Sequence, residues 1–181
     1  MLKELYLKNF VNSNHCNQIY SYLKEHTSKT YNVDNTRPWF ENNNLFYSQI
    51  EDPYIKDLVR NYIIKLSVVA TLHFKKKIYP HYTDLVLWNK GKSMEAHVDD
   101  GRGSNNEIRK VLKPRHVSSL IYLNDNFTGG QTFVGKKKFK PEQGAVLLFK
   151  SNIKHGVTEI TNGIRGTIAS WFTKDFDSLD I

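Results

Sequence analysis

The chain contains a single cysteine, Cys16, and therefore cannot form an internal disulfide. It also lacks a long apolar segment, because the best run, Leu66 to Phe74, is far shorter than the roughly 20 residues that cross a bilayer. The first residues carry charge at Lys3, Glu4 and Lys8 and do not resemble a signal peptide. These absences argue against a disulfide-stabilised secreted domain and against a membrane protein. They favour a soluble, cytoplasmic protein.

The composition is that of one folded domain with an excess of positive charge. The 181 residues are 39% hydrophobic and 13% aromatic, which suits a single core and argues against disorder. The net charge of +8 favours an acidic partner through long-range attraction and leaves direct nucleic-acid binding open. The basic clusters lack the regular aromatic interleaving of a single-strand binding groove, which argues against that second partner. Lysines that simply solvate the surface would give the same composition.

The hydrophobic pattern predicts helices first and short strands afterwards. An alternating strand is expected within Leu2 to Val11, and helices are expected from Asn12 or Ser13 to His26 and from Pro53 to Phe74. The polar segment between these helices, from Thr27 to Asn44, is expected to cross the surface. Eight strands should follow, at Ile78–His81, Asp84–Trp88, Met94–Asp99, Arg115–Leu123, Gln131–Val134, Ala145–Phe149, His155–Ile160 and Arg165–Phe172.

This order of elements predicts a mainly β protein with N-terminal helices, of the α+β class. The expected architecture is a double-sheet jelly roll, or double-stranded β-helix, with the helices packed on one outer face. We expect one domain over residues 1–181. Residues 1–77 would form a helical support region, and residues 78–174 would form the jelly-roll catalytic core.

One short motif could bind a metal ion. In an extended strand His97 and Asp99 point to the same face, and Val98 points to the other. A second imidazole, such as that of His155, would complete the 2-His-1-carboxylate ligand set of non-haem Fe(II) oxygenases. On its own, His-x-Asp fits two polar residues near a turn equally well.

A buried arginine is predicted on the last strand. Arg165 and Thr167 share a face there and would point into the same cavity. A guanidinium keeps its charge and needs an acceptor, but no carboxylate lies at a spacing that obviously pairs with it. A bound dicarboxylate would supply the acceptor. An acid elsewhere in the core is the alternative.

From Asp84 to Phe172 the sequence resembles the Fe(II)- and 2-oxoglutarate-dependent dioxygenases, and within them the prolyl 4-hydroxylase-like branch. The four residues His97, Asp99, His155 and Arg165 occur in the order of that family. The other matching segments are Leu87-Trp88-Asn89-Lys90-Gly91, Arg115 to Asn124, Gly129-Gly130-Gln131-Thr132-Phe133, Pro141 to Phe149 and the strand from Arg165 to Trp171.

The resemblance implies that His97, Asp99 and His155 bind Fe(II) and form the catalytic centre. It implies that Arg165 pairs with the distal carboxylate of 2-oxoglutarate, a position where many relatives carry lysine. Further co-substrate contacts are implied for Tyr122, Thr132, Thr167 and Trp88. Trp88 is a departure, because relatives usually carry a tyrosine there and an indole offers only one N–H donor. Core packing for Tyr122 and a turn hydroxyl for Thr132 remain open.

The resemblance also implies a peptide substrate. Arg115 and Trp171 fall where relatives hold the substrate near the iron, although Trp171 could equally be a core aromatic. The pairing of Arg115 with Tyr122, and of Arg165 with Trp171, favours hydroxylation of a proline in a protein or peptide. Succinate and CO2 would be the co-products, O2 the oxidant and ascorbate the reductant. The polar loop from Asp100 to Pro114 is expected to fold over the substrate as a lid.

Three other functions remain open at this stage. A free amino acid or another small molecule could be the substrate. Demethylation of nucleic-acid bases would suit the charge, but the last strand reads Arg165-Gly166-Thr167-Ile168-Ala169-Ser170-Trp171 and lacks the pattern of those relatives. A non-enzymatic jelly-roll binding module would have no reason to keep all three ligands and the arginine.

Overall fold

The computed structural model describes residues 4–27, 43–102, 112 and 115–175. Two long helices form near the N-terminus, α1 (Ser13–Thr27) and α2 (Pro53–Phe74), with a 3-10 turn, η1 (Tyr47–Gln49), between them. Helix α2 begins at Pro53, and the side chain of Asp52 accepts a hydrogen bond from the Ile55 amide at 3.0 Å. It ends at Phe74, and the next residue, Lys75, caps it in the left-handed conformation that terminates helices.

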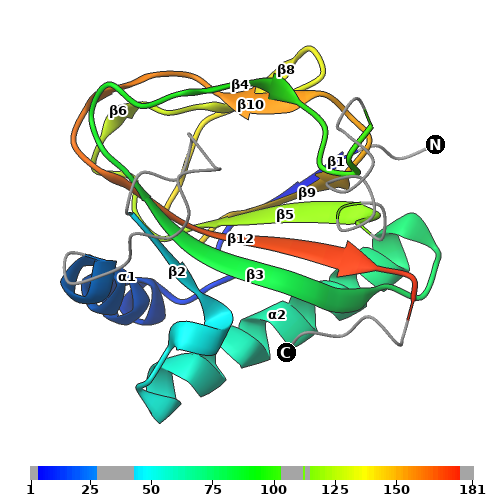
Figure 1. Cartoon of the computed structure of the whole chain (residues 1–181), viewed down its shortest axis with the longest axis horizontal. Helices are drawn as coiled ribbons and strands as arrows, with labels where there is room; N and C mark the ends of the chain where they lie inside the picture. The colour runs from blue at the N-terminus through cyan, green and yellow to red at the C-terminus, as the bar shows by residue number, and fades with distance from the viewer. Residues whose placement is uncertain (1–3, 28–42, 103–111, 113–114, 176–181) are drawn as a thin grey trace.

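The strands form two main antiparallel sheets and one small one (Figure 1). The six-stranded sheet has the order β1-β9-β5-β12-β3-β2, the four-stranded sheet the order β4-β10-β7-β8, and β11 pairs with β6. The strand bounds are β1 (Glu4–Leu7), β2 (Asn44–Phe46), β3 (Tyr79–Trp88), β4 (Met94–His97), β5 (Val117–Tyr122), β6 (Thr128–Gly129), β7 (Thr132–Val134), β8 (Lys137–Phe139), β9 (Val146–Lys150), β10 (His155–Val157), β11 (Ile160–Asn162) and β12 (Arg165–Thr173). The predicted jelly roll is confirmed.

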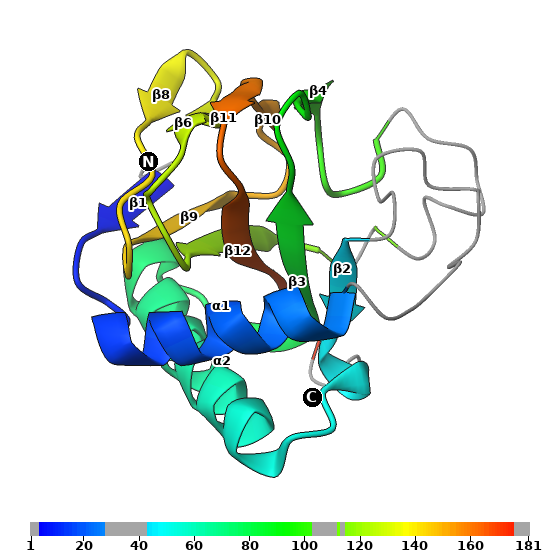
Figure 2. The same cartoon turned by 90° about the vertical axis from the view of Figure 1, so that its left-hand side faces the viewer.

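Both helices cover the outer face of the six-stranded sheet, as Figure 2 shows. The alternation along β12 divides its side chains between two environments. Ile168 and Phe172 face outward into the core shared with the helices, whereas Arg165 and Thr167 belong to the opposite face. That inner face looks toward the four-stranded sheet, so the side chains expected to carry chemistry lie between the two sheets.

Strands β6 and β8 were not predicted, and the strand expected over Met94–Asp99 ends at His97, so Asp99 lies just beyond it. Three further details of the fold differ from the prediction. Strand β2 was not predicted, and it pairs with β3 next to a segment that lies outside the described residues. Strand β3 is continuous from Tyr79 to Trp88, because no turn residue interrupts it at Tyr82 and Thr83. The predicted strand from His155 to Ile160 divides into β10 and β11, which pair with different partners.

The structure bears on two further expectations. Residues 1–77 contribute β1 and β2 to the main sheet in addition to the helices, so this region is not only helical. Most of the loop predicted as a lid lies outside the described residues. In the part of the chain that is described, no helix has the length and hydrophobicity needed to cross a membrane.

Candidate metal centre

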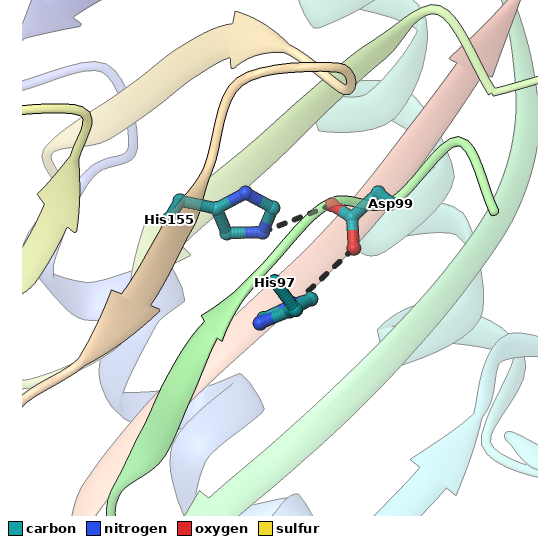
Figure 3. A group of neighbouring side chains, drawn as sticks. All are labelled: His97, Asp99 and His155. Carbon is teal, nitrogen blue, oxygen red and sulfur yellow. Dashed lines mark ion pairs between the residues drawn. The ribbon is translucent and has the colours of Figure 1, made fainter. Parts of the chain in front are cut away.

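Two histidines and one aspartate meet at one end of the roll (Figure 3). His97 ends β4 and His155 begins β10, and the two residues are direct partners across these antiparallel strands. Asp99 follows two residues after His97. Its Oδ1 lies 3.4 Å from the Nε2 of His97, and its Oδ2 lies 3.2 Å from the Nε2 of His155. One ligand atom from each residue falls within 4.8 Å of the others, so the three can bind one ion.

Hydrogen bonds to the backbone fix which nitrogen of each imidazole is available. Nδ1 of His97 lies 2.9 Å from the Glu95 carbonyl oxygen, and Nδ1 of His155 lies 2.8 Å from the Ile153 carbonyl oxygen. A carbonyl only accepts, so each Nδ1 donates its proton there, and each Nε2 faces Asp99 and can offer a lone pair to a metal once it is deprotonated. This is the usual arrangement of metal-binding histidines, in which a second partner orients the ring.

The carboxylate of Asp99 is held by two serines that the sequence analysis did not identify. Ser118 donates to Oδ2 at 2.6 Å, and the Ser118 hydroxyl also lies 2.9 Å from the hydroxyl of Ser151. The Asp99 amide donates to the Ser151 carbonyl at 2.8 Å. Both serines are buried. Asp99 is therefore fixed at its backbone and at its side chain.

The site favours a negative charge on the aspartate and a proton on one histidine. Burial opposes ionisation of Asp99, but hydrogen bonds with His155, His97 and Ser118 outweigh it and hold its pKa well below the ordinary value. Burial also opposes a charge on His97, yet its hydrogen bond with Asp99 raises the pKa of the imidazole above 6.5. A cation at this position would meet an ionised acceptor.

The guanidinium of Arg165 is fully buried between two aromatic rings. Its side chain is 1% exposed, and its carbon lies 5.5 Å from the centre of the Tyr122 ring and 5.9 Å from that of Trp88. It donates to the hydroxyl oxygen of Thr132 at 3.2 Å, and Tyr122 donates to the same oxygen at 2.8 Å. Burial lowers the pKa of Arg165 from 12.5, and no ion pair with a described residue compensates its charge.

Two polar atoms at and beside Arg165 lack a partner among the described residues. They are the Nε of Arg165 and the hydroxyl of Thr167, both buried. Buried polar groups are normally hydrogen-bonded, so their presence beside an uncompensated charge fits a bound anion with several acceptor atoms. A carboxylate would satisfy the charge and the donors together.

Asn124 holds the backbone on both sides of Arg165. Its side-chain amide donates to the Ile164 carbonyl at 2.8 Å, and its side-chain oxygen accepts from the Gly166 amide at 2.7 Å. Gly130 leaves room for the Arg165 side chain, because a Cβ at residue 130 would lie 3.0 Å from Cδ of Arg165 and 2.9 Å from the Phe127 ring. Arg165 is thus positioned by neighbours that hold its backbone and leave space for its side chain.

The predicted substrate residues form an aromatic group beside the metal site. The Arg115 guanidinium lies 4.1 Å from the centre of the Trp171 ring and 5.5 Å from that of Tyr82. Trp171 is paired across the sheet with Ser118, the residue that binds Asp99. The sequence analysis associated Arg115 with Tyr122 and Arg165 with Trp171. The structure pairs them the other way, Arg115 with Trp171 and Arg165 with Tyr122.

The structure thus brings the three ligands together, places Arg115 and Trp171 beside Ser118 next to them, and gathers the other four predicted residues around Arg165. Ser118, Ser151 and Asn124 were missed. Ser118 and Asn124 do lie within a segment that matches the family, but a serine or asparagine carries no local signal of its partner. Their partners lie 19, 33 and 40 residues away along the chain.

The sequence matches the family described as the 2OG-Fe(II) oxygenase superfamily over residues 75–173, which is more than half of the chain. A PKHD-type hydroxylase from Rippkaea orientalis is 25% identical over 118 residues, covering 60% of this chain and 51% of that protein. Human prolyl 3-hydroxylase 2 is 39% identical over 70 residues, covering 34% of this chain and 10% of that protein. The chain thus spans about half the length of the first relative and a small part of the second.

Solved structures share the fold over almost the whole chain. A Pseudomonas putida prolyl-4-hydroxylase aligns with a TM-score of 0.70 at 16% identity, covering 96% of this chain and 93% of that one. A Trichoplax adhaerens prolyl hydroxylase, in complex with a hypoxia inducible factor oxygen degradation domain peptide fragment, aligns with a TM-score of 0.72 at 16% identity. It covers 97% of this chain and 86% of that one. At this identity the likeness concerns the fold.

Proposed function

Because the chain belongs to the 2OG-Fe(II) oxygenase superfamily, we propose that it is an Fe(II)- and 2-oxoglutarate-dependent dioxygenase that hydroxylates a prolyl residue in a protein or peptide. The observation that carries this proposal is the combination of the His97, Asp99 and His155 ligand group with the uncompensated, buried guanidinium of Arg165. The first can bind a ferrous ion and the second a carboxylate. A binding module without chemistry would require neither.

The residues present fit the proposed iron and co-substrate. His97 and His155 offer their Nε2 atoms and Asp99 its carboxylate, which is the facial ligand set of non-haem iron oxygenases. Fe(II) with bound 2-oxoglutarate supplies O2 activation and oxidation of a C–H bond, with succinate and CO2 as co-products. Ascorbate is proposed as the reductant that keeps the iron ferrous.

The chain's own contribution is binding, orientation and exclusion of water. Arg165 would bind the distal carboxylate of 2-oxoglutarate, with the Thr167 and Tyr122 hydroxyls as neighbours and the Trp88 ring closing one side. Thr132 holds both Arg165 and Tyr122 in place. Burial of these side chains would keep water away and strengthen each polar contact among them.

A proline-containing peptide is the substrate that the neighbouring groups support best. Arg115, Trp171 and Tyr82 form an aromatic and cationic wall next to the metal site, which could hold an extended peptide and pack against a pyrrolidine ring. The relatives named above include a prolyl 3-hydroxylase and a prolyl-4-hydroxylase, and the proposal is hydroxylation at C4. The single cysteine, buried and free, is compatible with the cytoplasmic location that we propose.

The test measures two products in one reaction. The protein is incubated with Fe(II), 2-oxoglutarate, ascorbate and a library of proline-containing peptides in air. Succinate is quantified, and peptides are searched by mass spectrometry for the addition of one oxygen atom. We expect succinate formation that increases with a subset of peptides, and hydroxyproline in those peptides.

Controls separate the parts of the proposal. A His97→Ala variant should form no succinate, because it lacks a metal ligand. Chromatography of the hydrolysed product against 3-hydroxyproline and 4-hydroxyproline standards decides the position. Succinate formation without any modified peptide would retain the oxygenase and reject the prolyl substrate. If the wild type forms no more succinate than His97→Ala, the dioxygenase itself is rejected.

A further inference from the structure

The C-terminal end of α2 lies beside the end of β12 (Figure 1, right). A cavity of about 830 Å³ is lined there by residues of α2 and by residues next to β5, β9 and β12. Arg165 and its neighbours Tyr122, Thr132 and Trp88 do not line it. Its lining comes from five separate segments of the chain and is mostly basic. The cationic side chains that line it are Lys75, Lys76, Arg102, Arg115, Lys150 and Lys174, and His73 and His116 also border it.

The positive charge of this basic cavity has little compensation from its own lining. Asp100 is the only carboxylate among the lining residues, and it is already bound to Arg102 at 2.6 Å. The ammonium groups of Lys75, Lys76 and Lys174 form no ion pair with any described residue. An anion that enters the cavity would therefore meet several cations at once.

Burial and the neighbouring positive charges change the pKa of one of these lysines. Burial lowers the pKa of Lys174 from 10.5, and the nearby charges of Lys76 and Lys150 lower it further. Cations near a helix C-terminus are favoured by the helix dipole, which accounts for Lys75 and Lys76. It does not account for Lys150, Lys174 and Arg102, which belong to other segments.

The basic cavity adjoins the metal site through shared segments of chain. Asp100 follows the ligand Asp99, and Val117 precedes Ser118, which binds Asp99. Lys150 and Asn152 flank Ser151, which contacts Ser118. Arg115 lines the cavity and also stacks on Trp171 of the proposed substrate wall. A peptide at that wall would have a neighbouring segment within reach of the cavity.

We propose that the basic cavity binds an acidic segment of the peptide substrate, with at least two carboxylates, that lies outside the residue to be hydroxylated. This inference rests on the proposed function and specifies its substrate class. Flexible lysine side chains can meet carboxylates in more than one geometry, so the cavity selects charge more than shape. The lining offers no series of aromatic rings on which bases could stack, which disfavours a single-stranded nucleic acid.

The test compares the binding of two peptides of equal length by fluorescence anisotropy. Both contain one proline, and one carries three aspartates beside it where the other carries asparagines. The protein is loaded with Mn(II) and 2-oxoglutarate so that binding is measured without turnover. We expect the acidic peptide to bind the wild type about tenfold tighter or more, equivalent to one or two net ion pairs. The preference should decrease as salt is raised.

Matched variants test whether the lysines of the basic cavity cause the preference for the acidic peptide. In the Lys76→Glu/Lys174→Glu variant the preference for the acidic peptide should disappear or reverse, and in Lys76→Gln/Lys174→Gln it should fall part of the way. The Lys136→Glu control reverses an exposed lysine in the turn between β7 and β8, outside the lining of the cavity. It should keep nearly the full preference. Thermal unfolding of each variant verifies that the fold is retained.

The outcomes distinguish this inference from the proposed function. Equal affinity for the two peptides, or the same loss of preference in Lys136→Glu as in the double variant, overturns the acidic-segment proposal. So does displacement of the acidic peptide by a single-stranded oligonucleotide at equal concentration. Succinate formation is measured separately. An active enzyme that shows no preference for the acidic peptide therefore rejects the acidic-segment proposal and retains the proposed dioxygenase function.

Discussion

His97 and His155 face each other directly across the antiparallel strands β4 and β10, and their ring centres lie 4.3 Å apart. The strand register alone brings together two ligands that are 58 residues apart in the sequence (155 − 97). Asp99 then reaches both imidazoles from the chain that leaves β4. The metal site thus depends on one pair of strands, and its ligands should act as a unit.

Removal of either histidine should abolish tight metal binding. Loss of a residue that only supports a ligand typically costs 10- to 100-fold in metal affinity, so loss of a ligand in His97→Ala or His155→Ala should cost more than about 100-fold. Calorimetric titration with Mn(II) measures it without oxidation. His73→Ala is the control, because His73 lies outside the ligand group, and it should bind Mn(II) like the wild type. Equal binding by all four proteins would rule out this site.

Two adjacent serines on β5 offer a matched pair of variants. Ser118 donates to the Asp99 carboxylate, whereas Ser119 donates to the Ser170 carbonyl at 3.3 Å on the other face of the sheet. Ser118→Ala should weaken Mn(II) binding by about 10- to 100-fold, because the carboxylate loses the donor that orients it. Ser119→Ala should leave Mn(II) binding unchanged and lower the free energy of unfolding by about 1 kcal/mol. The same loss of Mn(II) affinity in both variants would contradict the role of Ser118.

Arg165 should determine the affinity for 2-oxoglutarate. Arg165→Met removes the charge and keeps much of the volume, so it should abolish 2-oxoglutarate binding while Mn(II) binding remains. Replacement of a buried charge by an apolar side chain is often neutral or stabilising, so the melting temperature without 2-oxoglutarate should not fall sharply. Arg165→Lys should retain weaker binding. Calorimetry with 2-oxoglutarate provides the measurement, and undiminished binding by Arg165→Met would assign the carboxylate site elsewhere.

The family motifs in the sequence were sufficient to name the three ligands and the arginine, but strand alternation explains only part of their placement. Arg165 and Thr167 share a face of β12 as that period predicts, whereas β4 ends at His97 and Asp99 reaches the site from the turn that follows. The alternation does not give the register between distant strands, so the contacts of Arg115 and Arg165 with the two aromatic residues were exchanged. Ser118 and Asn124 could not be assigned because their roles depend on partners brought close only by the fold.

The pH dependence of metal binding should follow His97. Its pKa is raised, because the hydrogen bond with Asp99 outweighs burial, and its imidazole must lose a proton to bind a metal. Mn(II) affinity should therefore rise with pH through the neutral range and level off above the pKa of His97. Calorimetry in buffers of different ionisation enthalpy should show proton release on binding. A flat profile from pH 6 to 8 would contradict the raised pKa.

The stability of the metal-free protein should vary in the opposite direction over part of this range. A raised pKa of His97 stabilises the fold fully below pH 6.5, and this contribution is lost as pH rises through the pKa of the folded state. The lowered pKa of Asp99 contributes stability above about pH 4, which is lost as pH falls further. In His97→Gln the first of these changes should be absent from the profile of unfolding free energy against pH.

Asn124 should act on 2-oxoglutarate through the position of Arg165. Its side chain bonds the carbonyl of Ile164 and the amide of Gly166, so Asn124→Ala would release the backbone on both sides of Arg165. Loss of these two hydrogen bonds, and of a third to Asn126, should lower the unfolding free energy by about 2 kcal/mol or more. It should also weaken 2-oxoglutarate binding by about tenfold, while Mn(II) binding stays near that of the wild type.

The comparison with Asn126 makes this assignment specific. Asn126 accepts a hydrogen bond from Asn124 at 2.6 Å and, among the described residues, does not hydrogen-bond the backbone next to Arg165, so Asn126→Ala should have a smaller effect on 2-oxoglutarate affinity. Asn124→Asp keeps an acceptor for the Gly166 amide and places a carboxylate against the Ile164 carbonyl, so it should lie between alanine and the wild type. A merely structural role would lower stability in Asn124→Ala and weaken Mn(II) and 2-oxoglutarate binding in equal proportion. Selective loss of 2-oxoglutarate affinity requires that Asn124 acts through Arg165.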